Sequence, residues 1–484
     1  MFYMNQKIKQ FYYSLIAFVL IAAGFAVFIG RVTGETLPED RRYLPQSVRH
    51  TVMGSIYDRN GTLIGSGSDI GAENWEPTYS VSFGNLIGPS VLLTRVNSIY
   101  SRVYFGDILY GQKADHLTAS DLVDFTDVRT GGLVTLTIDA ELQNYVYDYL
   151  AARYDDASAA VINYKTGEIL ALVSVPSYDL SYEASLHRRE DADGTLVIDD
   201  IRAVNKAINE LNMPGSSIKP LIYTAALEYD PSLISKKFTC TGSYTNAAGI
   251  TVSCPGHRAH GVLGDMTSAL AVSCNGYAEH IYEEITKTAE GRAILSRILH
   301  EFGFDRAYRY TGLRFADGVF SGIDPSPEMK AYSVIGGGQC RITTFGLAAA
   351  YSAIANHGSM MEPHLLKSWQ ADTRSEVVET NLRESRTICS KETASTVLDM
   401  MQGVTKFGTG QTMALEGFKV ASKTGTAVHD NSDKETLWAT AILDSEEFPY
   451  VVAVMIDETD PSFQNSSNTA GVAVHSILEY LTTH

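Results

Sequence analysis

The sequence predicts an α+β protein that has one large domain, a smaller domain before it and a single membrane-spanning helix near its start. The chain has 484 residues, which exceeds the usual size of one domain. An uncharged apolar run stands close to the first residue. Strand-like segments lie at both ends of residues 131–484 and helix-like segments lie between them, so distant segments are expected to close one sheet.

The composition indicates a globular protein and excludes one class of partner. Hydrophobic residues make up 45% of the chain and charged residues 19%, so the chain is neither disordered nor fibrous. The formal net charge is -18, and no basic patch offsets it. Because phosphate backbones attract clustered lysine and arginine, nucleic acid is not expected as a partner.

The apolar run over residues 11–30 predicts a transmembrane anchor that follows a cytoplasmic tail at residues 1–10. Twenty uncharged residues in a helix span roughly 30 Å, the thickness of the hydrocarbon layer. The run ends in Phe-Ile-Gly and has no small-x-small cleavage pattern, so it is interpreted as an uncleaved anchor. Lys7 and Lys9 are balanced by arginines after the run, so the charges do not decide its orientation.

Residues 31–130 are interpreted as a small accessory domain because they are polar and show no sustained helical period. Within them, Gly54–Gly61 carries strand residues that lead into an Asn-Gly turn, which predicts a hairpin. The pattern changes at Gly131, where a short strand precedes a helix. One face of that helix carries Leu142 and Val146 together with Tyr149 and Leu150. A second domain is therefore expected over residues 131–484.

Further strands and helices are expected inside the second domain. Ala159–Pro176 predicts a hairpin, and two late apolar runs, ETLWATAILD and PYVVAVMID, predict two more strands. Trp438 in the first of these runs is expected to pack beside the strand that carries FKVASKTGTAV. The expected helices cover Ser216–Glu228, Ser268–Thr286, Thr344–Asn356 and Lys391–Lys406.

The first chemical element is Ser216 with Lys219, at the start of a predicted helix. Positions i and i+3 share a helix face, so the lysine amine is within reach of the serine hydroxyl and can accept its proton. A lysine acts as a base only when burial or a second cation lowers its pKa. Taken alone, the pair would be better explained as a capping serine beside a solvated lysine.

The second element is Ser273 with Asn275, separated by one residue. A serine hydroxyl can relay a proton, and an asparagine amide offers a donor and an acceptor to a peptide backbone. A similar tripeptide, Ser466–Asn468, lies in a loop-like stretch after the third element.

The third element is Lys423-Thr424-Gly425-Thr426, on a predicted strand. Lys423 and Gly425 share one face by period-two alternation, so the amine is expected to enter a cleft while the glycine lets substrate backbone approach the strand. A second Lys-Thr-Gly, at Lys165–Gly167, is explained by the turn of the predicted hairpin.

Together and in this order, the three elements form the signature of penicillin-binding proteins and serine β-lactamases. The chain resembles the class B, monofunctional branch of the penicillin-binding proteins, which are peptidoglycan D,D-transpeptidases. IYDRNG resembles the N-terminal module of that family, LTIDAELQ and TGEILALVSVPSYD resemble the start of its catalytic domain, and FGTG followed by KTGTA resembles its late region. The resemblance covers about residues 50–460, and it implies an antiparallel sheet with flanking helices.

The resemblance implies a serine acyl-enzyme mechanism. Ser216 would attack the carbonyl of the penultimate D-alanine, Lys219 would deprotonate it, and Ser273 would pass a proton to the departing D-alanine. Asn275 would hold a substrate amide. The terminal carboxylate would be bound by Lys423, Thr424 and Thr426, with Gly425 between them, and the backbone N–H groups of Ser216 and Thr426 would form the oxyanion hole.

The resemblance also implies partners and a location. The substrates would be peptidoglycan stem peptides that end in D-Ala-D-Ala, with β-lactams as covalent inhibitors and no cofactor. The catalytic domain would lie outside the cytoplasmic membrane, where the accessory domain would dock a polytopic lipid-II glycosyltransferase. Deleting residues 31–130 would then disrupt docking and spare acylation of Ser216.

Several positions depart from the usual family pattern. Met53-Gly54 stands where Arg-Gly is frequent, and Ile335–Gly338 reads Ile-Gly-Gly-Gly in place of Ile-Gly-Gln-Gly. Thr343-Thr344 replaces Thr-Pro, and Ser422 replaces the glycine before Lys423. None of these positions has an expected role in proton transfer.

Five cysteines are present, and the spacing of two of them allows a disulfide without fixing it. Cys240 and Cys254 bracket a loop that a disulfide could close outside the cell. Cys254, His257 and His260 have the close spacing of metal ligands, but a fourth ligand is missing from the pattern, so no metal is expected. Cys274 is interpreted as a packed thiol.

Two alternatives remain open. One is a hydrolase on the same scaffold, either a D,D-carboxypeptidase or a β-lactamase, although the Glu-x-x-x-Asn element of class A β-lactamases is absent between Gly276 and Ser422. The other is a non-catalytic β-lactam-binding, sensing or scaffold protein, in which the acyl-enzyme persists.

Overall fold

The computed structural model of the chain describes most of the sequence from Thr51 onward. The described residues are 51–52, 54–66, 79–88, 105–109, 129–181, 186–190, 196–198, 200–305, 309–310, 313–314, 316–320, 327–372, 375–380, 384–428, 435–458 and 467–484. The predicted anchor at residues 11–30 lies outside them. In these ranges, no helix combines the length and the apolar character that a membrane crossing needs.

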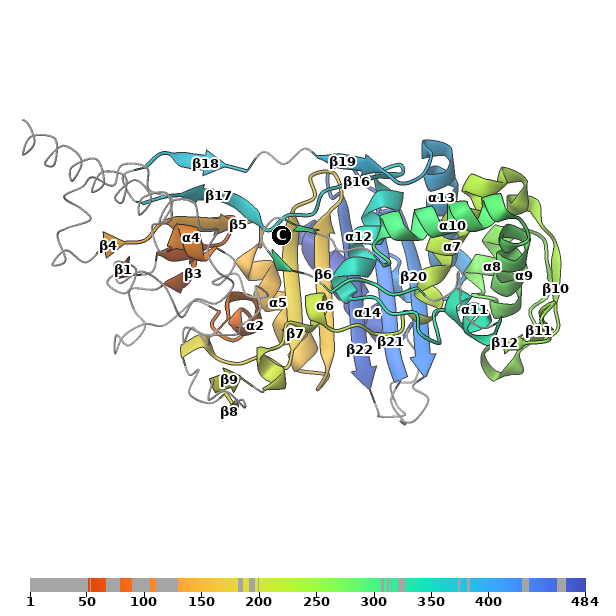
Figure 1. The fold of residues 1–484 in the computed structure, drawn as a ribbon, viewed down its shortest axis with the longest axis horizontal. Coiled ribbons are helices and arrows are strands. Elements are labelled where there is room, and N and C mark those ends of the chain that lie inside the picture. The colour runs from red at the N-terminus through yellow and green to blue at the C-terminus, as the bar shows by residue number, and fades with distance from the viewer. Residues whose placement is uncertain are drawn as a thin grey trace, which may run out of the picture. The chain divides into compact units, whose positions relative to one another are not determined.

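The centre of the protein is a five-stranded antiparallel sheet with the strand order β20-β21-β22-β6-β7 (Figure 1). The early hairpin meets the late strands because β22 pairs with β6, with Ala453 opposite Ala160. The predicted closure of one sheet by distant segments is therefore confirmed. The strands are β6 (Ala157–Asn163), β7 (Ile169–Val175), β20 (Val420–Val428), β21 (Glu435–Leu443) and β22 (Tyr450–Glu458).

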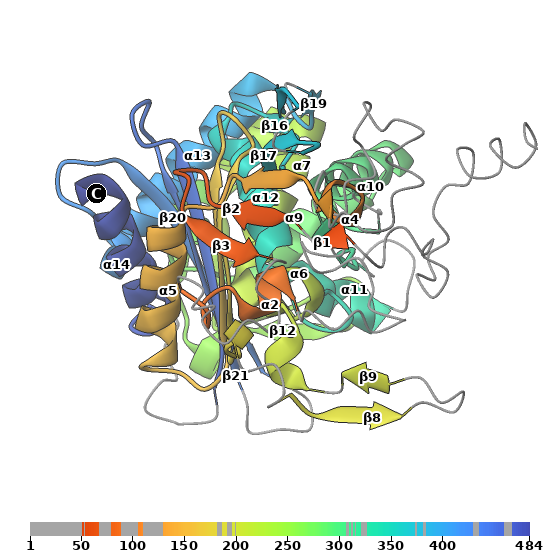
Figure 2. The same ribbon diagram turned by 90° about the vertical axis from the view of Figure 1, so that its left-hand side faces the viewer.

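Helices cover both faces of this sheet, which explains why its strands are apolar almost without interruption. Alternate residues enter two separate cores: Ala159 and Val161 pack on one side, and Ala160 and Ile162 on the other. The first core lies under α5 (Ala140–Ala151) and α14 (Ala470–Thr483), which are neighbours in Figure 2. The second core lies under α12 (Thr344–Ala355), which contacts β6 and β22.

Helix α5 forms largely as its sequence pattern predicts. Asp139 caps it by accepting a hydrogen bond from the backbone N–H of Leu142. Leu142, Val146 and Leu150 are buried against the sheet, whereas Tyr149 is only half-buried.

A group of helices packs into the second core and flanks the first two chemical elements, whereas the third element lies on β20. This group comprises α7 (Lys219–Tyr229), α8 (Met266–Ala271), α9 (Asn275–Thr286), α10 (Ala289–Phe302), α11 (Pro327–Val334) and α13 (Lys391–Phe407). Two of the predicted helices differ from the expectation. Ser216 lies in a short 3-10 turn, η5 (Gly215–Ile218), before α7 begins. The expected helix over Ser268–Thr286 is two helices, because Ser273 between them has a φ of 55°, which an α-helix does not allow.

A second five-stranded sheet has the order β18-β17-β5-β2-β3. Its strands are β2 (Ser55–Tyr57), β3 (Leu63–Ser66), β5 (Leu133–Leu136), β17 (Leu366–Gln370) and β18 (Val377–Glu379). It combines strands from both sides of the predicted domain boundary at residue 131. Residues 50–484 form one compact unit.

The predicted hairpin near residue 58 is confirmed, and it also supports α5. The Asp58 carboxylate accepts hydrogen bonds from the backbone N–H groups of Asn60 and Thr62, at 2.9 and 2.7 Å, which close the turn between β2 and β3. Its second oxygen accepts one from the backbone N–H of Ala140, at 3.0 Å. One carboxylate therefore stabilises the turn and the first turn of the helix.

Trp438 is buried in β21, opposite Gly425 of β20, as expected from the sequence. Its indole N–H donates a hydrogen bond of 2.8 Å to the carbonyl of Met213, three residues before Ser216. This bond joins the sheet to the segment that leads into η5.

Replacing Trp438 by phenylalanine should therefore destabilise the protein. The substitution leaves the buried Met213 carbonyl without its donor, which costs about 1–3 kcal/mol. We expect the melting temperature of Trp438→Phe to fall by several degrees. The control is Trp369→Phe, at a half-buried position in β17 of the other sheet. Equal melting temperatures for wild type and Trp438→Phe would contradict this assignment.

Candidate active site

The three chemical elements converge around the amine of Lys219. The lysine Nζ lies 3.0 Å from the Ser216 Oγ and 3.3 Å from the Ser273 Oγ, and it donates to the Asn275 Oδ1 at 2.6 Å. From the third element, Lys423 donates to the Ser273 Oγ at 3.0 Å. The hydroxyl of Ser273 thus lies between two lysine amines. A candidate nucleophile, base and proton relay are within hydrogen-bond reach of one another.

Close backbone packing holds Ser216 against strand β20. Gly215 has a φ of 54°, and a Cβ at that position would lie 2.9 Å from the backbone nitrogen of Thr426. A Cβ on Gly425 would collide with the carbonyl oxygen of Pro214. The glycine of the third element therefore admits the turn that carries the nucleophile, a role that the sequence pattern did not predict.

The turn that carries Ser216 has two further supports that the sequence pattern did not reveal. The Ser217 hydroxyl donates to the carbonyl of Pro214 at 2.5 Å. Buried Tyr351, from α12, donates to the carbonyl of Ser217 at 2.7 Å. Tyr351 follows no motif in the sequence, so only the fold identifies it.

Both lysines are buried without a carboxylate partner. Lys219 and Lys423 are inaccessible to solvent, and among the described residues neither forms an ion pair with an acidic side chain. Lys206, an equally buried lysine outside the site, lies 2.5 Å from an oxygen of Asp156. Burying an ammonium without a partner costs free energy, so burial favours the neutral amine and lowers the pKa of both lysines.

The electrostatics of the two lysines follow from this burial. Burial lowers the pKa of Lys219 to about 8, although the nearby thiols of Cys274 and Cys254 partly oppose the shift. Burial, together with the charge of Lys219, lowers the pKa of Lys423 well below its usual value. Because two positive charges so close together repel each other, protonation of one lysine lowers the pKa of the other, and the two amines titrate as a coupled pair. Near neutral pH most of Lys219 carries a proton, and the smaller neutral fraction is available to Ser216 as a base.

Asn275 is engaged with protein groups on both sides of its amide. Its Oδ1 accepts from Lys219, and its Nδ2 donates to the carbonyl of Ser253 at 2.8 Å. Ser253 is another residue that the sequence analysis missed, and it directly precedes Cys254. In this structure Asn275 orients Lys219 and joins the second element to a neighbouring strand.

The two threonines of the third element have different environments. Thr424 is buried, and its hydroxyl donates to that of Thr409 at 2.8 Å, which gives the FGTG segment a direct role in the site. Thr426 is the exposed member of the pair. Ser422, which stands where the family has glycine, pairs its hydroxyl with that of Thr405 at 2.8 Å. The departure at Ser422 is therefore compensated by a local hydrogen bond.

The second Lys-Thr-Gly, at Lys165–Gly167, is confirmed as a turn. It joins β6 to β7, Gly167 has a φ of 81°, and Lys165 pairs with Glu446 at 3.2 Å on the surface. In the second Ser-x-Asn tripeptide, Ser466–Asn468, the serine lies outside the described residues.

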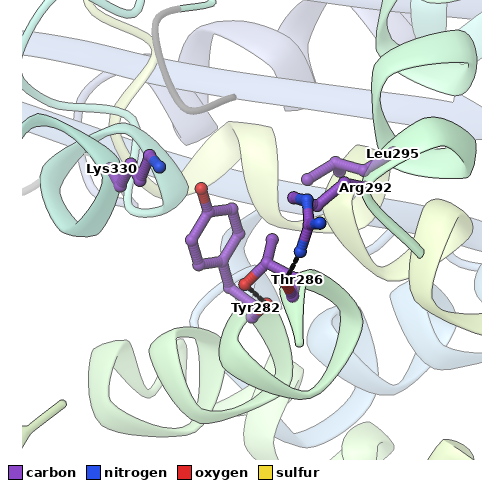
Figure 3. Close-up of a pocket in the computed structure, with 5 residues that line it drawn as sticks. All are labelled: Tyr282, Thr286, Arg292, Leu295 and Lys330. Carbon is purple, nitrogen blue, oxygen red and sulfur yellow. Dashed lines mark hydrogen bonds between the residues drawn. The ribbon is translucent and has the colours of Figure 1, made fainter. Parts of the chain in front are cut away.

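A cavity of about 220 Å³ lies apart from these residues. Figure 3 shows that it is lined by Tyr282 and Thr286 of α9, Arg292 and Leu295 of α10, and Lys330 of α11. Arg292 donates to the carbonyl of Thr286 at 2.6 Å. The cavity contains none of the motif residues, so its size does not mark the reactive centre.

The cysteines differ from the expectation. Cys240 and Cys254 are both free, with their sulfur atoms 3.8 Å apart, so the predicted disulfide is absent. The Cys274 sulfur lies equally close to that of Cys254, at 3.8 Å, and His260 joins the same cluster. These four residues could hold a metal ion, whereas His257 is exposed and does not belong to the cluster.

Comparison with known proteins agrees with the geometry. A family model described as the penicillin binding protein transpeptidase domain matches residues 157–479. The peptidoglycan D,D-transpeptidase PbpA of Mycobacterium tuberculosis is 27% identical over 485 residues, which cover 94% of this chain and 94% of that protein.

Solved structures share the fold. The crystal structure of PBPA from the same organism matches with a TM-score of 0.75 at 23% identity, over 89% of this chain and 99% of that chain. An imipenem acyl-enzyme complex of that protein matches with a TM-score of 0.74 at 23% identity, over 90% of this chain and 100% of that chain. The chain described here thus belongs to the penicillin-binding protein transpeptidase family.

Proposed function

We propose that this protein is a peptidoglycan D,D-transpeptidase that cross-links stem peptides through an acyl-enzyme on Ser216. The observation that carries the proposal is the position of a buried lysine amine, without a carboxylate partner, 3.0 Å from the Ser216 hydroxyl. Membership of the transpeptidase family supports it. So does the imipenem acyl-enzyme seen in the structural relative from M. tuberculosis.

Acylation begins with transfer of the Ser216 proton to the neutral amine of Lys219. The serine oxygen then attacks the carbonyl carbon of the penultimate D-alanine, and negative charge develops on the carbonyl oxygen. The backbone N–H groups of Ser216 and Thr426 would stabilise that charge. An oxyanion-hole donor commonly contributes about 3 kcal/mol to lowering the barrier.

Collapse of the tetrahedral intermediate breaks the C–N bond to the terminal D-alanine, whose nitrogen must gain a proton. Ser273 is suited to deliver it, because its hydroxyl lies 3.3 Å from the amine of Lys219 and 3.0 Å from that of Lys423. The proton taken from Ser216 can return by this route. Lys219 then becomes neutral again and is ready for the second half of the reaction.

Substrate binding would use the exposed end of β20. We assign the terminal carboxylate of the stem peptide to Thr426 and Lys423, with Thr424 holding the strand through Thr409. Asn275 would exchange one of its present protein contacts for a substrate amide. A carboxylate near Lys423 would favour the protonated form of that lysine and so leave Lys219 as the base.

In the second half of the reaction, an amine from a neighbouring stem peptide attacks the acyl-enzyme. The ester bond to Ser216 breaks, and a new peptide bond joins the two strands. Attack by water would instead make the protein a D,D-carboxypeptidase or a β-lactamase. The arrangement of two lysines around Ser273 favours a working enzyme over a non-catalytic β-lactam-binding protein.

We further propose that residues 11–30 anchor the chain in the cytoplasmic membrane with the catalytic domain outside, where its substrate lies. The uncharged run over those residues supports the anchor. Residues 31–130 would form a pedestal that docks a polytopic lipid-II glycosyltransferase. Because β2 and β3 pair within the sheet that contains β5 and β17, deleting all of residues 31–130 would also disturb the fold.

The acyl-enzyme is tested by intact-protein mass spectrometry of the full chain, in detergent, after incubation with benzylpenicillin. We expect one covalent adduct, which peptide mapping places on Ser216 and which Ser216→Ala abolishes. Ser232→Ala is the control because it removes the hydroxyl of an exposed serine outside the site and keeps the nucleophile. A folded wild type that forms no adduct would refute the acyl-enzyme and favour a non-catalytic binding role.

The pH dependence of acylation tests the base. Because the pKa of Lys219 is lowered to about 8, its amine is mostly protonated below that pH and mostly neutral above it. The second-order rate constant for β-lactam acylation should therefore rise about tenfold per pH unit below pH 8 and level off above it.

Lys219→Arg provides the control for this profile, because a guanidinium cannot lose its proton in this range. We expect it to be inactive at every pH. A wild-type rate that stays constant from about pH 6.5 to about pH 9 would mean that Lys219 is not the base.

The membrane anchor is tested by deleting residues 1–49, which lie outside the compact unit of residues 50–484. The truncated chain should move from the membrane fraction to the soluble fraction and keep its benzylpenicillin adduct at Ser216. If full-length protein leaves the membrane fraction after a carbonate wash, the anchor is wrong.

A further inference from the structure

Three cysteines and one histidine meet directly behind the second chemical element. The sulfur atoms of Cys240 and Cys274 each lie 3.8 Å from that of Cys254, and the Nδ1 of His260 lies 3.4 Å from the Cys240 sulfur. All four donor atoms lie within 4.8 Å of one another. The three cysteines are buried and His260 is half-buried.

The four residues come from separate short elements. Cys240 ends β10 (Phe238–Cys240), which pairs with β13 (Gly261–Leu263), and this pairing brings His260 beside it. Cys254 follows β12 (Thr251–Ser253), which pairs with β11 (Ser243–Thr245). Cys274 is the residue before α9 and accepts from the backbone N–H of Tyr277 at 3.4 Å. The strand pair β10–β13, the hairpin β11–β12 that it encloses in the sequence, and the start of α9 therefore converge on the cluster.

Three of the six separations between the donor atoms match a tetrahedral metal site, and the other three lie within 4.8 Å. Zinc binds cysteine sulfur at about 2.3 Å and histidine nitrogen at about 2.0 Å, so tetrahedral ligands lie about 3.8 Å apart for two sulfurs and about 3.5 Å apart for sulfur and nitrogen. The separations of 3.8, 3.8 and 3.4 Å agree with these values. A disulfide would bring two sulfurs to about 2.05 Å and leave the third thiol and the histidine unexplained.

We propose that Cys240, Cys254, Cys274 and His260 bind one Zn²⁺ as a closed structural site. Three thiolates and one imidazole form a donor set that zinc accepts in structural sites, whereas Mg²⁺ and Ca²⁺ require oxygen ligands. The four ligands fill the tetrahedral positions, so the site is not a second catalytic centre. Cys240 and Cys274 supply the ligands that the pattern of Cys254, His257 and His260 lacked, and exposed His257 takes no part.

The site would also position the second chemical element, an inference that rests on the proposed function. Cys274 lies between Ser273 and Asn275, and Cys254 follows Ser253, whose carbonyl accepts from Asn275 at 2.8 Å. A metal bound to both cysteines restrains both partners of that hydrogen bond. Ser273 has a φ of 55°, a conformation that needs support from its surroundings. Cys274 is thus a positioning residue for the proton relay.

The short hairpins offer a physical reason for a metal at this place. Strands β10 to β13 have three residues each and pair only in twos, and many of their residues are exposed. Pairs of strands this short are marginally stable by themselves. A zinc ion can supply the missing stability because its binding free energy becomes folding free energy.

Metal content of the purified full chain tests the site. The chain is expressed without added metal, purified in detergent and analysed by inductively coupled plasma mass spectrometry, and we expect one zinc ion per chain. Replacement by Co²⁺ should give the thiolate charge-transfer bands and the visible bands of a tetrahedral thiolate site. Wild-type protein that is folded and free of zinc, or that contains a Cys240–Cys254 disulfide in its peptide map, would overturn the proposal.

Matched variants locate the ligands. His260→Gln and Cys274→Ser should each weaken zinc binding by more than about tenfold in competition with a chelator. The controls are His257→Gln, an exposed histidine three residues away, and Cys389→Ser, a buried cysteine outside the cluster. Both controls should keep the wild-type zinc content. Equal zinc loss in the controls would show that the cluster is not the site.

Removal of zinc tests the coupling to catalysis separately. Chelation should slow β-lactam acylation of Ser216 by more than about tenfold, and added Zn²⁺ should restore the rate. Full acylation by zinc-free protein would overturn the positioning role and leave the transpeptidase assignment intact. Zinc-replete protein that never acylates would contradict the proposed function while the metal site stands.

Discussion

The chemistry of this protein depends on the burial of two lysine amines beside one serine hydroxyl. An ammonium removed from water loses its hydration, and here no carboxylate compensates Lys219 or Lys423 among the described residues. Lys206 shows the ordinary solution, a buried lysine held by Asp156. Burial disfavours the charged form of Lys219 and lowers its pKa to about 8, so a fraction of this amine is neutral near neutral pH and can act as a base.

Elements from several parts of the fold position the buried lysines and Ser216. Strand β20 carries Lys423 at the edge of the central sheet, and close glycine packing presses the turn around Ser216 against it. Hydrogen bonds from Trp438 of the sheet and Tyr351 of α12 to backbone carbonyls hold the same segment in place. On the far side, the second element depends on two small hairpins, where a bound zinc ion would add the rigidity that such short strands lack.

Much of this arrangement could be predicted from the sequence, because apolar periodicity reports which segments lie between two cores. The strands of the central sheet and the reach of Lys219 to Ser216 follow from local patterns, whereas the meeting of both with Ser273 was implied only by the resemblance to penicillin-binding proteins. The break at Ser273, the contact of Gly425 with Pro214 and the pairing of Thr424 with Thr409 do not follow from these patterns, and the last two join separate segments of the chain.

The cluster of three cysteines and His260 also could not be predicted from the sequence. Its four residues come from the strand pair β10–β13, the end of β12 and the start of α9. Cys274 also lies inside the Ser-x-Asn element, to which the sequence analysis had assigned a different role. Sequence spacing alone favoured a disulfide between Cys240 and Cys254. Only the relative placement of the hairpins brings the third sulfur and the histidine to the same point.

The most direct test of this account is a titration of Lys219 itself. Carbon-13 at the lysine ε position reports protonation of the amine by NMR, and the signal is assigned by its absence in Lys219→Arg. The account predicts a midpoint near pH 8 for the free enzyme, in keeping with the pKa of about 8. A midpoint near the ordinary lysine value of about 10.4 would contradict the claim that burial prepares this amine as the base.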